Sequence, residues 1–353
     1  MKQRNGTNMA LHKTIQKILM TGVRLPTAAL PAKPQVPAAL APLIAAIAPS
    51  HQAYNQQAIN YGHRYRSAFW AIYLLSAVAV LCAVLPLALG WDDPHSSLGD
   101  YAIIWVLAEV LVILLVGLIY WRGHRQDWQG LWLAARTKAE LAWYLPMIAP
   151  LVDWRDAQAT ANWYARLFKP ELAEAADSDI NTLCTTVAEL AKSSLDKAWD
   201  DPQFIHSYAQ WTVDILEGQR HYHQHVAHHQ HALMHRVHAI NTWLFSLTAL
   251  AALAHLVIHS KVLTLMTTFF PALGASLHGA LAQSEAYRLE ATSLRLVVDL
   301  EKVIAPIRQT LKAIDPLANT EVLRAAILSA VTLILDEHKD WHMLVRPHHL
   351  PLG

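Results

Sequence analysis

The sequence predicts an all-α integral membrane protein with four transmembrane helices in two hairpins plus a cytosolic helical bundle. Hydrophobic residues make up 54% of the 353 residues and charged residues only 16%, whereas soluble domains carry about 25% charged residues. The apolar residues gather in four stretches, each near the ~20 residues that a helix needs to cross a membrane. No segment alternates apolar and polar residues as a half-buried β-strand does.

The first two apolar stretches are predicted to form one transmembrane hairpin. Residues 67–91 contain no charged side chain, and residues 101–121 contain one, Glu109. As a helix, each stretch is long enough to cross ~30 Å of hydrocarbon. Aromatic residues stand at the ends of both stretches, where amphipathic rings prefer the membrane interface: Trp91, Tyr101, Tyr120 and Trp121.

The second predicted hairpin is formed by residues 239–259 and 262–283. Polar side chains such as His255 and His278 dilute these two stretches, so a buried soluble hairpin is the alternative. Neither stretch contains Asp, Glu, Lys or Arg, which favours two membrane spans.

Basic residues predict the orientation of the four spans. The first outer loop contains no Lys or Arg, and the second contains only Lys261. The positive-inside rule therefore places both termini and the central region in the cytoplasm. The arginines that flank the spans on the cytoplasmic side are Arg64, Arg66, Arg122, Arg125, Arg236 and Arg288.

The rest of the chain is predicted to be helical and cytosolic. The N-terminal part has an amphipathic stretch followed by a Pro/Ala-rich tract, and it lacks the apolar core and cleavage site of a secretory signal. Helix breaks are expected near Pro146–Pro150, Lys169–Pro170 and Asp200–Pro202. The predicted regions are an arm or peripheral helix at 1–60, the first hairpin with its extension at 61–150, cytosolic helices at 151–235, the second hairpin with its extension at 236–310, and an amphipathic helix within 311–353 that packs on the bundle.

Composition argues against several functional classes. The formal net charge of +1 leaves no electrostatic footprint for nucleic acid. The two cysteines, Cys82 and Cys184, cannot build a disulfide framework or a zinc cluster. No glycine-rich nucleotide-binding loop and no combination of nucleophile, base and orienting group is visible, so neither a cofactor nor an enzymatic reaction is expected.

Six stretches together carry a resemblance to a known family. They are "YGHRYRSAFWAIYLLSAVAV", "LAEVLVILL", "ARTKAELAW", "GQRHYHQH", "FFPALGASLHGALAQSEAYRL" and "LDEHKDWHML". Their order and spacing resemble bacterial membrane proteins with two transmembrane hairpins similar to SLATT-type domains. Such domains are the two-span effectors of bacterial conflict systems and are attached to nucleotide-sensing modules. The resemblance implies a pore-forming membrane effector in the bacterial inner membrane.

The resemblance also marks individual positions. An amide stands at Asn55 where an acid is expected, and Ala142–Trp143 occupies the stretch where an arginine is expected after Glu140. The short N-terminal arm stands where relatives carry a nucleotide-binding sensor, which implies a separate nucleotide-sensing protein as partner. The family-like positions are Tyr65, Arg66, Glu109, Arg136, Glu140, Gln219, Tyr222, His223, Pro271, Gly274, Gln283, Glu285 and Trp341.

Glu109 is the one acid inside the predicted spans. A bare carboxylate in hydrocarbon is costly, so this side chain must be protonated, paired or in contact with water. It either lines a cation path or is a buried acid that is hydrogen-bonded to Ser276, His278 or a neighbouring span.

Small residues in the fourth span predict close helix packing. Such residues allow two helices to approach closely, either within the chain or between subunits around a pore. Pro271 is expected to kink this span, either as a structural feature or as a gate. The small residues at helical spacing are Ala272, Ala275, Ser276, Gly279 and Ala280.

Two charged pairs lie just inside the predicted membrane boundary. Arg136 and Glu140 are four residues apart, and Glu285 and Arg288 are three apart. We expect solvated helix faces for both pairs, with pairing across the two hairpin extensions as the alternative.

Eight histidines fall within His221–His238, just before the third span. At 100° per residue most of them share one half of a helix, and His223 lies opposite, on the side expected to pack. A polar interfacial face is favoured over a pH response. No metal site is expected, and the weak candidates are the four-residue pairs His221/His225 and His231/His235.

An enzyme is the competing interpretation of these histidines. "HVAHH", "HALMH" and "HKDWH" superficially match the histidine boxes of di-iron membrane oxidoreductases. The first two boxes are contiguous on one helix, however, whereas a di-iron cage needs ligands that converge from separate helices. The function that the resemblance implies is a homo-oligomeric membrane effector that is gated through its cytosolic helices, with a non-conducting scaffold and the oxidoreductase as alternatives.

Overall fold

A computed structural model of the protein describes residues 10–25, 34–91, 101–152, 178–195, 197–312 and 320–345. Within these ranges the chain forms helices and no β-strand, so the predicted all-α class is confirmed. The helices are α1 (Leu11–Leu19), η1 (Ala38–Leu40), α2 (Ala41–Leu89), α3 (Ala102–Arg125), α4 (Trp128–Ile148), η3 (Ala149–Leu151), α7 (Ser178–Ser194), η4 (Ala198–Asp200), α8 (Pro202–His255), α9 (Lys261–Gln283), α10 (Ala286–Leu311) and α11 (Thr320–Val345).

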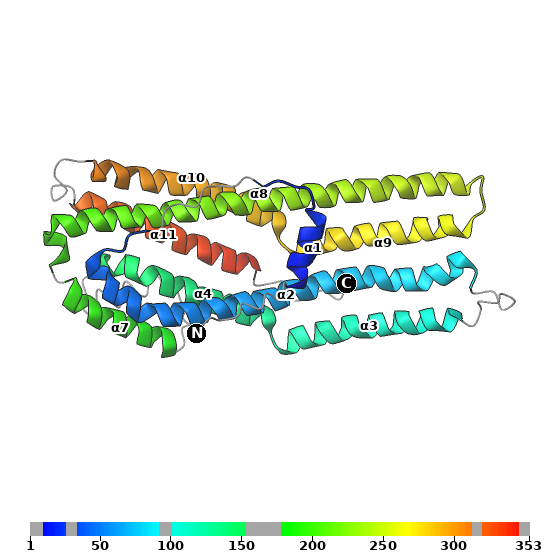
Figure 1. The fold of residues 1–353 in the computed structure, drawn as a ribbon, viewed down its shortest axis with the longest axis horizontal. Coiled ribbons are helices and arrows are strands. Elements are labelled where there is room, and N and C mark those ends of the chain that lie inside the picture. The colour runs from blue at the N-terminus through cyan, green and yellow to red at the C-terminus, as the bar shows by residue number, and fades with distance from the viewer. Residues whose placement is uncertain are drawn as a thin grey trace.

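The helices form a long rod with two different halves (Figure 1). One half holds α3, α9 and the apolar parts of α2 and α8, and the other holds α4, α7, α10, α11 and the remaining parts of α2 and α8. We call them the apolar half and the bundle half. In the apolar half α3 packs on α2, α2 on α9, and α9 on α8. Four of the described helices are long and apolar enough to cross a membrane.

Helix α2 is longer than the sequence predicts. Instead of an N-terminal arm that extends to residue 60, α2 begins at Ala41, with Pro42 in its first turn. Leu43 and Ile47, one helical turn apart, are buried in the bundle core, and this burial stabilises the helix across Pro49. Only the residues before Ala41 remain outside α2.

Helix α8 joins the histidine-rich stretch and the third apolar stretch in 54 residues without a break. It begins where a break was predicted, because the Asp201 carboxylate accepts a hydrogen bond from the Gln203 amide (2.9 Å) and Pro202 occupies the first turn. The predicted break near Pro146–Pro150 is also present, since α4 gives way to η3 there. The predicted break at Lys169–Pro170 lies outside the described residues.

Two hydrophobic cores stabilise the rod. The bundle core includes Tyr208, whose hydroxyl donates a hydrogen bond to the Met147 carbonyl (2.6 Å), and the inner face of α11 around Ile327. The C-terminal helix therefore packs on the bundle, as the sequence predicts. The second core, which we call the junction core, lies where the two halves meet and includes Trp70 and Leu281.

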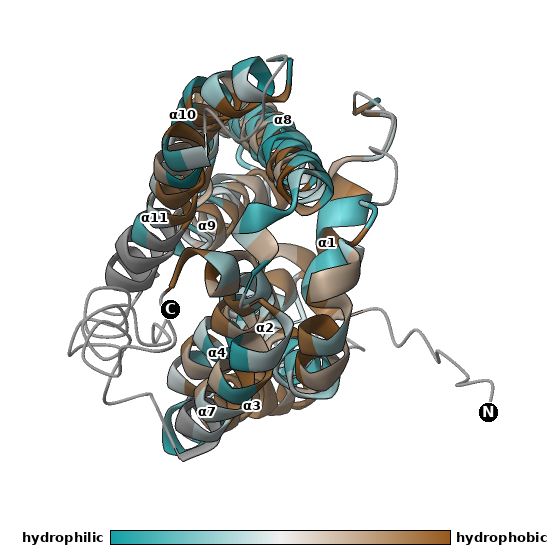
Figure 2. Ribbon diagram, turned by 90° about the vertical axis from the view of Figure 1, so that its left-hand side faces the viewer, coloured by the Kyte–Doolittle hydropathy of each residue, from teal (hydrophilic) through white to brown (hydrophobic). Residues whose placement is uncertain are grey.

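Helix α1 lies across the junction. It packs on α2 and α8 and occupies the side of the rod opposite α10 and α11 (Figure 2). The His12 imidazole Nδ1 lies 3.2 Å from the Ser67 hydroxyl, and Arg236 donates a hydrogen bond to the Thr21 carbonyl (2.9 Å). Burial, together with the charges of Arg66, His63 and Lys13, lowers the pKa of His12 to about 3.

The chain turns in the same way after each pair of apolar helices. Asp127 between α3 and α4 (φ 42°) and Glu285 between α9 and α10 (φ 56°) both adopt the left-handed conformation, which costs a non-glycine residue about 1–2 kcal/mol. The Asp127 carboxylate caps α4 by accepting a hydrogen bond from the Gly130 amide (3.1 Å). Glu285 does not cap α10 with its side chain, which instead lines the cavity described below.

Candidate functional site: a polar cavity at the junction

A polar cavity of about 400 Å³ lies where the bundle half meets the apolar half. Helices α2, α4, α8, α9 and α10 contribute to its wall. The structure thus brings together nine of the residues marked by the family resemblance, although they are far apart in the sequence. These residues are Tyr65, Arg66, Arg136, Glu140, Gln219, Tyr222, His223, Gln283 and Glu285.

Arg66 is held in the wall by α2 and α4. Its Nε donates a hydrogen bond to the Gly62 carbonyl (3.0 Å), and its guanidinium lies over the Trp132 ring at 5.2 Å from the centroid. A side chain at position 62 would collide with Trp132, so the glycine allows this arrangement. Burial lowers the pKa of Arg66 from its usual value. Among the described residues, Arg66 forms no ion pair with a carboxylate.

Arg136 and Glu140 form an ion pair within α4. The expected solvated face is wrong for this pair, because the Glu140 side chain is only 16% exposed and lines the cavity. Burial raises the pKa of Glu140, and the charge of Arg136 opposes that rise. The helix face was mispredicted because the spacing of four residues does not show that α2 packs along α4.

The floor of the cavity links the two pairs of apolar helices. The Gln283 amide at the end of α9 donates a hydrogen bond to the Tyr65 hydroxyl on α2 (3.0 Å). The Tyr65 ring in turn stacks on Trp132 of α4, with 5.8 Å between the ring centroids. Next to Gln283, Glu285 lies 3.4 Å from Arg288. A displacement of α4 or α10 would therefore act directly on α2 at Tyr65 and on the end of α9 at Gln283.

His223 lies on the packed side of α8, as its position on the helix predicts. Its Nδ1 is 3.4 Å from the Ser293 hydroxyl on α10. Burial, together with the charge of Arg136, lowers the pKa of His223 to about 4. The side chain is therefore neutral near pH 7, and it adds no positive charge to the cavity.

The other histidines of α8 do not converge on one point. His231 Nδ1 lies 2.8 Å from a Glu290 carboxylate oxygen, and the His231 and His235 rings are 4.5 Å apart. His225 is exposed, while His221 Nδ1 is buried without a hydrogen-bond partner in the part of the chain that the structure describes. In that part no three His, Cys, Asp or Glu side chains gather as a metal site would require.

The predicted polar residues inside the spans are not brought together. Glu109 on α3 is half-buried and faces α2 near Cys82. Ser276 is buried on α9, and His278, which is exposed, lies on the same helix with its ring 6.3 Å from that of His238. Because α2 lies between α3 and α9 (Figure 1), the expected pairing of Glu109 with Ser276 or His278 does not occur.

The small residues of α9 serve packing within the chain. A side chain at Gly279 would collide with the Tyr73 ring of α2, and Ala280 is fully buried beside it. Ala272 is half-buried, whereas Ala275 and Pro271 are exposed. Among the small residues predicted to pack, Gly279 and Ala280 therefore form the contact between α2 and α9.

Some residues of the site were not found from the sequence. Trp132 is the main omission, and its spacing of four residues from Arg136 and eight from Glu140 on α4 could have indicated it. Gln230 of α8 lines the cavity as well. Of the other family-like positions, Gly274 of α9 lies near Asn241 of α8, and Trp341 lies in α11 with its side chain outside the part of the chain that the structure describes.

A search of protein-family models, of curated proteins and of solved structures finds no match to this chain.

Proposed function

We propose that the protein is a membrane effector of a bacterial defence system, similar to SLATT-type proteins, whose spans are moved by its cytosolic helices. The observation that carries this proposal is the continuity of α2 and α8, which run from the bundle half into the apolar half without a break. A shift of the bundle would therefore move two spans directly. The cavity at the junction is the place where a signal would act.

The proposed location is the bacterial inner membrane, with both termini in the cytoplasm. Arginines of four different helices flank the apolar segments at the junction end, whereas Lys261 lies at the far end. This asymmetry fits a bilayer around the apolar half and cytosol around the bundle half. A separate nucleotide-sensing protein is the proposed partner of the bundle half.

A homo-oligomer is the proposed active form. Helix α3 packs mainly on α2, and its outer face presents apolar side chains such as Leu107, Leu111 and Leu114, each more than 60% exposed. Glu109 lies on this peripheral helix, where contact with hydrocarbon would be costly. A neighbouring subunit would pack on this apolar outer face, and the ion path would run between α2 and α3, on the side of α3 where Glu109 lies.

Ion flux from proteoliposomes tests this proposal. We expect the purified protein to conduct cations and the Glu109→Gln variant to conduct them with altered rate or selectivity. Glu321→Gln is the matched control, because Glu321 is 86% exposed on α11, far from the apolar half. Reconstitution with and without the candidate partner shows whether the spans are closed at rest.

The outcome separates the proposed function from its alternatives. Absence of flux with and without the partner would leave a non-conducting membrane scaffold. Two bound irons per chain would instead favour the histidine-box oxidoreductase. Flux that is equal in wild type and Glu109→Gln would remove Glu109 from the ion path.

A further inference from the structure

We propose that the cavity at the junction binds a small phosphate ester, whose phosphate group is held by Arg66. This inference goes beyond the proposed function, because the ligand would bind whether or not the spans conduct ions. It rests on the balance of charge, the hydrogen-bonding groups and the size of the cavity.

The cavity wall carries two arginines and two glutamates, but both glutamates lie beside an arginine other than Arg66. Arg136 is paired with Glu140, and Glu285 lies beside Arg288. Arg66 therefore remains as a half-buried cation without a carboxylate partner among the described residues. A charge that is partly removed from water is costly unless a counter-charge accompanies it. An anionic ligand would supply that counter-charge, and the planar guanidinium suits the oxygens of a phosphate.

Uncharged donors surround the cation. Gln219, Gln230 and Tyr222 line the cavity and make no hydrogen bond with another side chain in the ranges that the structure describes. The Tyr222 hydroxyl is close enough to Arg66 to interact with it electrostatically. Several donors around one cation match a phosphate, because this group accepts more hydrogen bonds than a carboxylate does.

The size of the cavity points to an ester rather than to inorganic phosphate alone. A volume of about 400 Å³ falls within the range of small-molecule sites. The Tyr222 ring, beside that of His223, offers an amphipathic wall for the organic part of the ester. Because the cavity adjoins the apolar half, the phosphate group could belong to a soluble metabolite or to a lipid headgroup.

The test uses the full-length protein in phosphatidylcholine nanodiscs. In the soluble arm, calorimetry measures the affinity for inorganic phosphate, glycerol 3-phosphate and adenosine monophosphate. In the lipid arm, the thermal unfolding midpoint is compared between discs with and without phosphatidylglycerol, since a ligand that binds only the folded protein raises this midpoint. Both arms use wild type, Arg66→Gln and Arg295→Gln, the last being the control because Arg295 is 82% exposed on α10.

We expect Arg66→Gln to weaken ester binding by at least about tenfold, since a charged hydrogen bond is lost, and Arg295→Gln to bind like wild type. If only the lipid arm depends on Arg66, the phosphate group belongs to a lipid headgroup. Binding in neither arm, or equal losses in both variants, would overturn the inference. Gln219→Leu and Gln230→Leu decide the question if Arg66→Gln does not fold. Ester binding without ion flux, both with and without the partner, would disprove the proposed effector function and leave the binding site intact.

Discussion

Gly279 of α9 faces the ring of Tyr73 on α2 so closely that a β-carbon at position 279 would collide with it. We therefore expect Gly279→Ala to destabilise the folded protein by about 1–3 kcal/mol, the usual cost of overpacking. The free energy of unfolding in detergent measures this effect. Replacing the ring as well, in Gly279→Ala/Tyr73→Leu, should restore part of the loss.

The control for this prediction is Gly117→Ala on α3. A β-carbon at position 117 meets no atom within 4 Å, and alanine favours a helix over glycine by ~1 kcal/mol. This variant should therefore be as stable as wild type or more stable. Equal destabilisation by both substitutions would contradict the assignment of Gly279 to the contact between α2 and α9.

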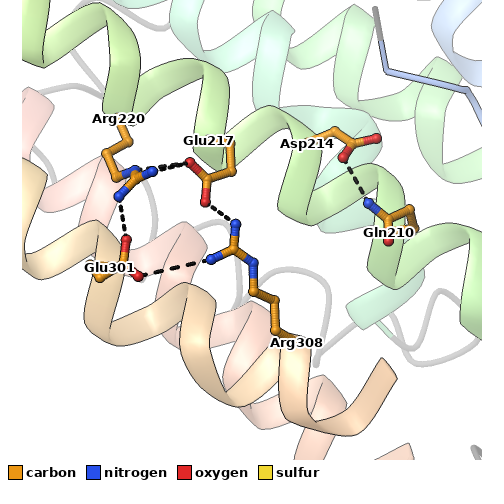
Figure 3. A network of polar contacts seen from close by, with 6 residues as sticks. All are labelled: Gln210, Asp214, Glu217, Arg220, Glu301 and Arg308. Carbon is orange, nitrogen blue, oxygen red and sulfur yellow. Dashed lines mark hydrogen bonds and ion pairs between the residues drawn. The ribbon is translucent and has the colours of Figure 1, made fainter. Parts of the chain in front are cut away.

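A second prediction concerns the ion-pair network between α8 and α10 (Figure 3). Glu217, only 11% exposed, accepts hydrogen bonds from Arg220 (2.8 Å) and from Arg308, and Arg220 also reaches Glu301 at 2.5 Å. Glu217→Gln removes the more buried of the two acids that contact both arginines, and it should lower the free energy of unfolding by about 1–3 kcal/mol. Denaturant titration measures the change.

Glu301 provides the matched comparison within the same network. Its side chain is 49% exposed, and exposed ion pairs contribute at most ~1 kcal/mol. Glu301→Gln should therefore cost less than Glu217→Gln. Equal losses would mean that burial of Glu217 does not strengthen this network.

The sequence predicts the positions of the helices better than their lengths. The four apolar stretches and the C-terminal helix follow from composition and periodicity, because these patterns reflect burial in lipid or in a core. The continuation of α2 back to Ala41 does not follow, since a proline inside a helix costs ~3 kcal/mol. Burial of Leu43 and Ile47 offsets that cost, and it becomes visible only when the bundle core is assembled.

The candidate site is predictable only in part. Nine residues that were chosen from the sequence as family-like lie around one cavity, but spacing along the chain does not reveal that Glu140 is covered. Of the partners considered for Glu109, Ser276 and His278 are separated from it by α2 for a similar reason, and Glu109 faces that neighbouring helix instead. The position of α2 between α3 and α9 depends on how whole helix faces pack, and the local sequence does not encode the order of the helices.

A third prediction concerns the attachment of α1. Arg236 of α8 holds this helix through its hydrogen bond to the Thr21 carbonyl (2.9 Å). Without it, local opening of α1 should become about tenfold more frequent, as expected for one hydrogen bond to a charged group. Amide hydrogen exchange over residues 10–25 of Arg236→Gln measures this opening. Exchange that matches that of the exposed Arg295→Gln control would show that α1 is held by its apolar contacts alone.

The last prediction is a pH dependence of stability that arises from His223. Its pKa is about 4 in the folded protein, because it is buried and lies near Arg136, against an ordinary value of 6.5. Between these two pH values the unfolded chain binds more protons at this position than the folded chain does. The contribution of His223 to stability is therefore fully present above pH 6.5 and is lost as the pH falls towards 4, by at most ~1.4 kcal/mol per pH unit.

Substitution isolates this contribution. In His223→Gln the free energy of unfolding should fall less steeply between about pH 6.5 and 4 than in wild type, and the difference in slope should correspond to nearly one proton. Denaturant titration at several pH values measures this slope. His225→Gln on the same helix serves as the control, because His225 is exposed. His12, which has a pKa of about 3, contributes in the same direction and explains why some slope should persist in His223→Gln. If the pH slope of stability is the same in His223→Gln and in wild type, His223 binds its proton equally well in the folded and the unfolded protein.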